Sequence, residues 1–329
     1  MEHQLIAIGD MTTDAFIRLK EAEVHCDINK DNCTISMRFG DKIPFDFVEE
    51  VPAVGNAANA AVAAARLGLS SALVSDIGSD DIGKQDIESL ARDAVDTAFV
   101  SRHAGMASNH HYVLWYGDER TILVKHQPYP YRLPEIGEPQ WLYLTSLSDH
   151  SLPYHREISQ YLKKHPSVKL AFQPGTFQIN LGVENLRALY ERTEVFICNI
   201  EEARRILKTT EKDIGKLFSG MHSLGPTTVL LTDGPRGAYA SDGGETWFMP
   251  PYQDPKAPVD RTGAGDAFGS TFVSALILGT SVPEALTWAP INSMSVVQYI
   301  GAQKGLLSQV KLEEYLKNAP EDYKPKQLK

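Results

Sequence analysis

One short segment combines small residues with a carboxylate at a spacing suited to phosphate chemistry. Residues 262–266 read Thr-Gly-Ala-Gly-Asp and lead directly into an apolar stretch typical of a buried helix. Glycine and alanine let a ligand approach the backbone closely, and the first N–H groups of a helix have no partner within the helix. The helix dipole adds partial positive charge at the same end, so we expect this turn to bind an anion such as phosphate.

Asp266 closes this turn, and its carboxylate allows two interpretations. It can cap the helix and do nothing more. Beside a bound phosphate, it can instead take a proton from an attacking hydroxyl. Glycine-rich turns are common, so the segment alone does not separate the two.

A second segment places amides beside a glycine at the start of an alanine-rich helix. Residues 55–68 begin Gly-Asn-Ala-Ala-Asn and end in Arg-Leu-Gly. Gly68 is the residue type expected just past a helix end, which predicts a helix over 56–67. Asn56 and Asn59 then either cap and pack this helix or face a ligand.

Together the two segments resemble the signatures of the ribokinase / phosphofructokinase-B (PfkB) carbohydrate kinase family. The resemblance implies that Asp266 is the catalytic base and that the backbone amides of Gly263, Ala264 and Gly265 form the anion hole for the transferring phosphoryl group. Two positions depart from the family pattern: Val54 replaces a glycine, and Arg261 stands where threonine is common.

The same resemblance extends to the acceptor side of the site. It implies that Gly55, Asn56 and Asn59 bind the substrate. Residues 9–14, Gly-Asp-Met-Thr-Thr-Asp, resemble the turn after the first strand, whose final Asp holds sugar hydroxyls in the family. A carboxylate accepts two hydroxyl donors well, so Asp14 is a substrate-binding candidate.

Three further matches concern ATP. Residues 199–202 resemble the family's Asn-x-x-Glu motif, which implies that Asn199 lies in the ATP site and that Glu202 holds Mg²⁺ through water, as suits an ion that keeps much of its hydration shell. Residues 232–237 resemble its nucleotide loop. This second match implies ATP contacts at Thr232, Gly234 and Gly237. The third candidate is Asn292, which lies on a late helix near the family's adenine pocket.

A last match concerns a monovalent cation. Asp260 and Thr262 correspond to positions that bind such an ion in ribokinase-like members, and residues 301–302 to another part of that loop. The resemblance therefore implies ATP and Mg²⁺ as cofactors, with K⁺ as a further ion.

Short apolar strands alternate with helices along the chain, which predicts βαβ units and a mostly parallel sheet. The predicted strands are 5–8, 72–75, 141–144, 169–172, 195–198 and 228–232. The predicted helices are 56–67, 84–93, 155–164, 183–191, 200–207, 213–224, 264–278 and 283–299. Alternating segments at 33–39 and 43–48 predict a small antiparallel sheet set apart from the core, and segments 110–116 and 120–124 predict two strands joined by a turn.

We therefore expect an α/β protein with a single ribokinase-like domain over 1–329. Its core would be a three-layer α/β/α sandwich with a mostly parallel sheet. A small β-sheet lid, from about 15–52 and 97–127, would be inserted in this core. By resemblance, the lid closes over the sugar and forms a homodimer contact.

Composition limits the other classes of function. The 329 residues are 43% hydrophobic, which excludes disorder of the whole chain, and the net charge of −10 argues against nucleic-acid binding. No apolar run is long enough to span a membrane, and the first residues lack the features of a signal peptide. Three cysteines are too few for a disulfide framework and predict small buried side chains, so we expect a cytoplasmic protein.

The resulting hypothesis is an ATP-dependent kinase that phosphorylates a hydroxyl of a sugar or related small molecule. A nucleoside kinase of the same family, and a non-catalytic sugar- or nucleotide-binding regulator, remain alternatives. A Rossmann-type dehydrogenase lacks support because no Gly-x-Gly-x-x-Gly follows the first strand. A sugar-phosphate acceptor would need cations in the pocket, for which Arg102, Arg120 and Lys125 are candidates.

His110 and His111 are tempting as a metal pair. Adjacent residues of a strand point to opposite faces, so the two imidazoles are not expected to share an ion. We expect one of them to face the substrate from the lid.

Overall fold

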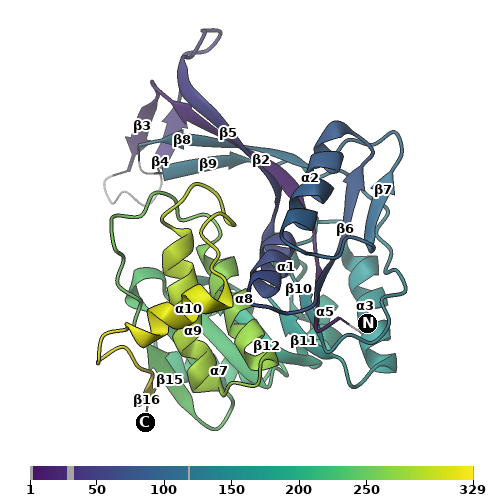
Figure 1. Cartoon of the computed structure of the whole chain (residues 1–329), viewed down its shortest axis with the longest axis vertical. Helices are drawn as coiled ribbons and strands as arrows, with labels where there is room; N and C mark the ends of the chain where they lie inside the picture. The colour runs from purple at the N-terminus through teal and green to yellow at the C-terminus, as the bar shows by residue number, and fades with distance from the viewer. Residues whose placement is uncertain (1–2, 28–32, 118, 329) are drawn as a thin grey trace.

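Buried apolar strands build the central sheet of the computed structural model, which describes residues 3–27, 33–117 and 119–328 (Figure 1). Within these residues the central sheet has ten strands, in the order β16-β15-β14-β13-β12-β11-β10-β1-β6-β7. In chain order they are β1 (Leu5–Ile8), β6 (Ser71–Gly78), β7 (Val100–His103), β10 (Trp141–Leu144), β11 (Lys169–Phe172), β12 (Thr193–Asn199), β13 (Thr228–Thr232), β14 (Ala238–Ser241), β15 (Thr246–Met249) and β16 (Lys326–Leu328).

In this sheet, β13, β12, β11, β10, β1, β6 and β7 pair in parallel with their neighbours. Strands β14, β15 and β16 extend the sheet from β13 by antiparallel pairing. The helices are α1 (Asn56–Arg66), α2 (Asp81–Arg92), α3 (Leu152–Lys164), α4 (Thr176–Leu181), α5 (Val183–Tyr190), α6 (Ile200–Leu207), α7 (Ile214–His222), α8 (Ala264–Ile277), α9 (Val282–Val296) and α10 (Gln309–Lys317), with a 3-10 turn at Gly234–Arg236.

Helices cover both faces of this sheet. Strand β1 shows it most simply, because its side chains alternate between two hydrophobic cores. Leu5 and Ala7 pack in the core that includes α1, α8 and α9. Ile6 and Ile8 pack in the core that includes α3, α5, α6 and α7. The predicted three-layer sandwich with a mostly parallel sheet is confirmed.

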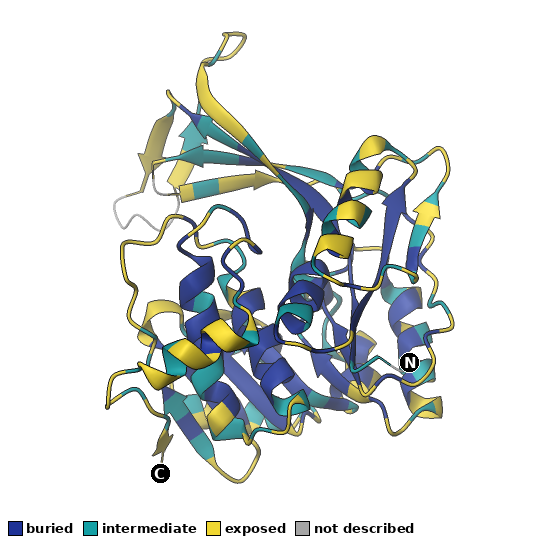
Figure 2. Cartoon of the chain, viewed as in Figure 1, coloured by how far each residue is buried: buried dark blue, intermediate teal, exposed yellow. Residues whose placement is uncertain are grey.

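A separate four-stranded sheet, which we call the lid, lies above one end of the core (Figure 1). Its order is β5-β2-β8-β9, with bounds β2 (Thr12–Leu19), β5 (Phe45–Val54), β8 (His110–Tyr116) and β9 (Glu119–Leu123). A short hairpin of β3 (Glu23–Cys26) and β4 (Cys33–Ser36) extends from it. In the lid, β9 and the first half of β5 are largely exposed, whereas β1, β6 and β10 of the central sheet are buried (Figure 2).

Both predicted lid segments contribute to the lid, with adjusted limits. The first segment, 15–52, contains residues 28–32, which lie outside the described residues. The second, 97–127, contains β7, which pairs with β6 in the central sheet and not with the lid. The lid therefore begins later in that segment, at β8. Strand β2 starts at Thr12, a few residues before the predicted limit.

Two cysteines differ from the expectation of small buried side chains. Cys26 and Cys33 face each other across β3 and β4, are exposed, and form a disulfide. Their pairing is local to one hairpin, which a count of three cysteines does not reveal. Cys198 is buried and unpaired, as expected. The cytoplasmic location, which relied on the cysteine count, stays a prediction.

Across the described part of the chain, no helix combines the length and apolar character needed to cross a bilayer.

Candidate active site

The predicted anion-binding turn lies at the N-terminus of α8. Gly263 precedes the helix with φ +77°, a left-handed conformation that favours glycine. A Cβ on Gly263 would lie 2.2 Å from the Cβ of Ala302, so the turn packs directly on the segment after α9. This close packing fixes the turn at the start of α8. The first N–H groups of the helix lack intrahelical partners, and the N–H of Ala264 donates to the carbonyl of Arg261 at 3.3 Å.

A cavity of about 440 Å³ opens beside this turn. Two predicted motifs that are far apart in the sequence meet in its wall: Ala264 and Gly265 from the anion turn, and Thr232, Gly234 and Gly237 from the nucleotide loop. The rest of the wall is mainly apolar, with residues such as Pro251, Tyr252, Phe268, Met294 and Val297. Apolar walls beside a helix N-terminus suit a purine nucleotide with its phosphates at the turn.

Asn199 and Glu202 lie at the start of α6, next to the same sheet edge. Asn199 is paired in register with Thr232. Its Oδ1 accepts from the N–H of Glu202, and the Glu202 carboxylate accepts from the N–H of Asn199, each at 2.8 Å. Asn199 and Glu202 thus form a capping box that stabilises the start of α6 without any ligand. Burial raises the pKa of Glu202, and the N–H of Asn199 partly offsets the rise.

The residues fit a magnesium ion that is bound mainly by phosphates and water. Among residues 3–27, 33–117 and 119–328, no three Asp, Glu, His or Cys side chains gather as a metal cage. Mg²⁺ is commonly held by one or two carboxylates plus substrate phosphates. Glu202 would supply that carboxylate, and the ion would neutralise phosphate charge.

Asn292 is placed differently from its predicted contact with ATP. Its side chain is fully buried and donates to Thr271, while its Oδ1 accepts from the N–H of Leu307. Both ends of the amide are therefore committed within the core. The neighbouring residues Ser293 and Met294 line the cavity instead. Adjacent positions of α9 therefore face the core and the cavity, and the sequence match did not show which of them faces the cavity.

Asp266 lies in the first turn of α8 and is buried, with amide donors around its carboxylate. Asn56 donates to Oδ1 at 2.7 Å and Asn59 to Oδ2 at 2.8 Å, both from α1. Gln173 also donates to Oδ1, at 3.2 Å. Burial raises the pKa of Asp266, and these three hydrogen bonds partly offset the rise. The site thus holds an oriented carboxylate whose pKa lies above the ordinary aspartate value.

Asn59 therefore serves Asp266 and is not free to contact a substrate. It is buried, and its Oδ1 accepts from Gln303, which also donates to the carbonyl of Ala53. Asn56 is only partly buried and keeps its Oδ1 for another donor. Gly55 adopts φ +103°, and a Cβ there would lie 2.7 Å from the carbonyl oxygen of Asp10.

Asp14 lies on β2, directly opposite His111 on β8. The Nδ1 of His111 is 3.4 Å from the Oδ1 of Asp14. That Oδ1 and the Nε2 of His111 are buried and form no hydrogen bond with any described residue. Buried polar atoms without a partner indicate a place for a polar ligand. His110 stacks on Tyr112 instead, so the two histidines do point to opposite faces.

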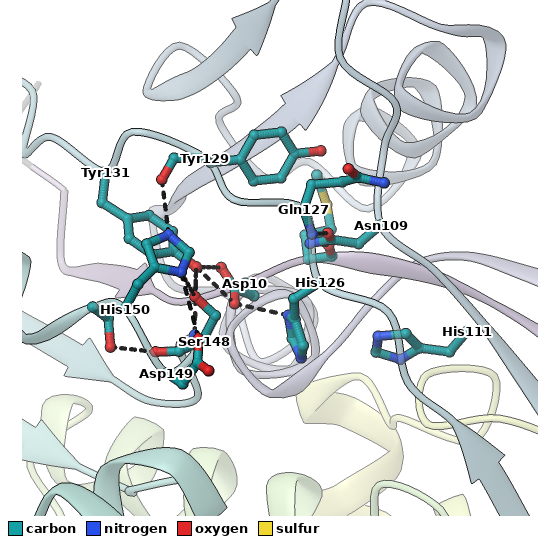
Figure 3. A network of polar contacts seen from close by, with 12 residues as sticks. Asp10, Asn109, His111, His126, Gln127, Tyr129, Tyr131, Ser148, Asp149 and His150 are labelled. Carbon is teal, nitrogen blue, oxygen red and sulfur yellow. Dashed lines mark hydrogen bonds and ion pairs between the residues drawn. The ribbon is translucent and has the colours of Figure 1, made fainter.

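A network around Asp10 continues this polar region (Figure 3). The hydroxyl of Tyr131 donates to Asp10 at 2.7 Å, and the Nδ1 of His126 lies 3.1 Å from its other oxygen. The rings of His126 and His111 are 5.4 Å apart, edge to face. His126 belongs to the segment that returns from β9 to the core, so core and lid both contribute to the region around Asp14.

The predicted monovalent-cation site does not fit K⁺. The carboxylate of Asp260 is buried, and the Nε of Arg120 from β9 lies 3.4 Å from its Oδ1. The same Oδ1 accepts from the hydroxyl of Thr262 at 2.8 Å. A guanidinium already stands beside the carboxylate that would bind the ion, and like charges at such a distance repel. The predicted role of Asp260 and Thr262 as ion ligands is therefore not supported.

Three further residues contribute to the site in ways that the sequence did not predict, although Arg120 was considered as a cation for a sugar phosphate. Gln173 and Arg120 are separated from Asp266 and Asp260 by more than 90 residues, and neither belongs to a recognised motif. His126 had no signal beyond its place at the end of the lid. Arg102 and Lys125, considered for a sugar phosphate, are exposed, and Arg102 lines a different cavity with Asp80 and Lys84.

Known proteins resemble this chain in sequence and fold. The model of the pfkB family of carbohydrate kinases matches residues 36–309. A ribokinase of Haemophilus influenzae is 27% identical over 274 residues, covering 80% of this chain and 87% of that protein. An ATP-dependent 6-phosphofructokinase of Thermoanaerobacterium thermosaccharolyticum is 26% identical over 294 residues, covering 82% and 85%.

Solved structures show the same fold. The Arabidopsis thaliana ribokinase complexed with ribose and ATP superposes with a TM-score of 0.80 at 22% identity, covering 96% of this chain and 99% of that one. The family model spans most of the chain, including both signature segments and the Asp266 helix. The chain therefore belongs to the pfkB family of carbohydrate kinases.

Proposed function

We propose that this protein transfers the γ-phosphoryl group of ATP to a hydroxyl of a sugar or related small molecule. The observation that carries the proposal is the position of Asp266. It directly follows Gly265, which lines the nucleotide cavity, and its carboxylate accepts hydrogen bonds from the Asn56 and Asn59 side chains of α1. A base is thus located where a phosphate turn and the predicted acceptor region adjoin.

Asp266 acts as the general base in this proposal. Oδ1 accepts two amide hydrogen bonds and Oδ2 accepts one, so a carboxylate lone pair is left for an acceptor hydroxyl. The raised pKa brings the group closer to neutral pH, where a base removes a proton more effectively. In-line attack by that hydroxyl then places negative charge on the phosphoryl oxygens, beside the N–H groups of α8.

The anion hole would stabilise that charge. The amides of Gly263, Ala264 and Gly265 stand at the positive end of the α8 dipole. Arg261 lines the same cavity and adds a cation where the phosphates would lie. Mg²⁺, when bound, screens the phosphate charge, and Glu202 is the carboxylate available to hold its water shell.

The acceptor region favours a hydroxyl-rich ligand without a phosphate. Asp14 and Asp10 present carboxylates there, and their ion pairs are with His111 and His126. Carboxylates accept hydroxyl donors but repel a phosphate. The Arg102 and Arg120 side chains are placed elsewhere, which removes two of the cations that a sugar phosphate would need.

A nucleoside acceptor is the second candidate, and one observation favours it. Phe177, at the start of α4, is 37% exposed, and its ring lies 5.9 Å from that of His126. An exposed aromatic ring beside a polar pocket can stack on a nucleobase.

The test is ADP release from ATP and Mg²⁺ against neutral sugars, sugar phosphates, keto-deoxy acids and nucleosides. We expect one neutral acceptor to stand well above the rest. Asp266→Asn keeps the size of the side chain and serves as the matched control. It should lower kcat by about a thousandfold while ATP binding persists.

Two results would contradict the proposal. The absence of acceptor-dependent ADP release throughout the panel, with ATP still bound, would favour a non-catalytic regulator. Near-normal turnover in Asp266→Asn would remove Asp266 from the base role.

The lid also supports the proposed homodimer. Strand register places Ile17, Val48, Tyr112, Leu114 and Leu123 on one face of the lid, which we call the outer face. Val48, Tyr112 and Leu123 are 45%, 45% and 52% exposed. An apolar sheet face left open to water favours association with a second copy. Sedimentation equilibrium of the purified chain tests this.

A further inference from the structure

We propose that Arg120 takes the place of a monovalent cation at Asp260, so that the lid itself supplies the positive charge and turnover does not depend on K⁺. The inference concerns the organisation of the anion turn and, for its kinetic arm, rests on the proposed kinase activity.

The position of Asp260 explains why a positive charge is needed there. Its side chain is 1% exposed, and an unpaired buried carboxylate is strongly unfavourable. Its oxygens accept from the N–H and hydroxyl of Thr262 and from the N–H of Gly301. These donors are neutral, so they satisfy lone pairs without cancelling the charge.

Arg120 supplies the missing charge from the lid. Its Nε lies 3.4 Å from the Oδ1 of Asp260, and its Nη2 donates to the carbonyl of Val259 at 2.6 Å. The guanidinium therefore contacts both a carboxylate and a backbone carbonyl, the two kinds of oxygen that would ligate a metal ion. Its side chain is only 11% exposed, which shields the ion pair from screening by salt.

The lid is built to hold Arg120 in this position. Arg18, Trp115 and Arg120 lie side by side on β2, β8 and β9. The guanidinium carbon of Arg120 is 3.9 Å from the centre of the Trp115 ring. Arginine is well suited to this combination of an aromatic face and a carboxylate.

The charge is connected to the anion turn by a short path. Asp260 binds the backbone of Thr262, which precedes Gly263 in the turn. It also binds Gly301, whose neighbour Ala302 packs against Gly263. Arg120 thus neutralises the residue that joins both segments around the anion hole. We regard it as a positioning residue, because it acts through Asp260.

A matched pair of variants separates charge at Asp260 from packing in the lid. Arg120→Ala removes the guanidinium, and Arg120→Lys retains a charge. Arg18→Ala is the control, since Arg18 also stacks on Trp115, at 4.6 Å, but donates to Gly117 within the lid. Each protein is assayed in KCl and in tetramethylammonium chloride at equal ionic strength.

We expect wild-type kcat to differ less than twofold between the two salts. Arg120→Ala should lose at least tenfold in kcat in tetramethylammonium, with a smaller change in KM for ATP. K⁺ or added guanidinium should raise the kcat of Arg120→Ala at least threefold. Arg120→Lys and Arg18→Ala should stay within about threefold of wild type.

Melting temperature provides a readout that needs no turnover. K⁺ should raise the melting temperature of Arg120→Ala relative to tetramethylammonium and leave that of the wild type unchanged. If no acceptor supports turnover, the proposed function fails while the melting data still decide the role of Arg120.

Four results would overturn the inference. They are tenfold activation of the wild type by K⁺, full K⁺-free turnover in Arg120→Ala, the same loss in Arg18→Ala, and a loss that neither K⁺ nor guanidinium restores. The last would show that Arg120 acts through packing alone.

Discussion

The core and the lid are both β-sheets, yet they treat apolar residues in opposite ways. All eight residues of β6 in the core are buried, whereas four of the five residues of β9 in the lid are exposed. In the lid, the inner face carries Asp14, His111 and Arg120, and the outer face leaves Tyr112 and Leu123 open to water. The central sheet is covered on both faces and acts as a scaffold, whereas the lid leaves its outer face open to solvent, where a partner can bind.

The difference also shows in how the two regions are joined. Polar contacts join the lid to the core. Arg120 pairs with Asp260, and Asp86 accepts hydrogen bonds from the two lid strands where they leave the core. Asp86 on α2 accepts from the hydroxyl of Thr13, at the start of β2, and from the N–H of Ala53, at the end of β5. Changes in the core should therefore affect catalysis and stability more than changes on the lid surface.

The largest expected effect is in the core, at the anion turn. Gly263→Ala places a methyl group 2.2 Å from the Cβ of Ala302 and forces alanine to φ +77°. The turn must shift, and kcat should fall at least about a hundredfold, as for the loss of an oxyanion donor. Gly244→Ala, in the turn between β14 and β15, is the control because its Cβ would meet only the Oδ1 of Asp242, at an ordinary 3.6 Å. Equal kcat in the two variants would contradict the assigned role of Gly263.

The next effect concerns the junction between core and lid. Burial raises the pKa of Asp86 to about 6 from its ordinary 3.8. The folded protein thus holds a proton there up to about pH 6, whereas the unfolded chain loses it near pH 4. The free energy of unfolding should therefore fall by roughly 3 kcal/mol as pH rises from 4 to 7 through this group.

Asp86→Asn isolates that contribution. The amide oxygen can still accept from Thr13 and Ala53, but the group no longer titrates. Urea unfolding at several pH values should show a smaller fall in stability for the variant than for the wild type. Identical pH profiles would show that Asp86 titrates normally in the folded protein.

A smaller effect is expected at Asn59, which donates to the proposed base Asp266. Asn59→Leu removes the hydrogen bond to Oδ2 of Asp266, which at present lowers the pKa of that group. We expect a loss of about tenfold in kcat, and the acidic limb of the kcat–pH profile should move to higher pH. The matched variant Asn56→Leu should raise KM for the acceptor as well. An unchanged acidic limb in Asn59→Leu would count against general-base catalysis by Asp266.

The smallest effect on stability is expected at the outer face of the lid. Leu123→Lys places a charge on an exposed apolar site of the edge strand β9, so the unfolding free energy should change by less than about 1 kcal/mol. The dissociation constant of the dimer, measured by sedimentation equilibrium, should still rise at least tenfold. Val24→Lys, on the exposed hairpin outside the four-stranded sheet, is the control. Unaltered association in Leu123→Lys would place the dimer contact elsewhere.

Most of the core could be predicted from the sequence because local pattern and tertiary environment agree there. Strands β1, β10, β11 and β13 have the predicted bounds, since short apolar runs flanked by helices leave little choice. The lid was predicted in outline, but β2 was not identified as a strand. Its Thr-Thr-Asp start lacks clear alternation, and pairing with β5 and β8 decides its structure. Strand β16 was not predicted either, because its pairing with β15 at the edge of the sheet decides its structure.

The sequence by itself determined the motifs: which turn offers free N–H groups, which carboxylate stands beside it, and which family the order of segments resembles. Those features are local, and a few adjacent residues suffice to specify them. Only the tertiary structure decided that Asn59 and Gln173 hold Asp266, that Asn292 is committed to the core, and that Arg120 faces Asp260. Such pairings join segments up to 207 residues apart, and no local pattern encodes which distant side chain will satisfy a buried charge.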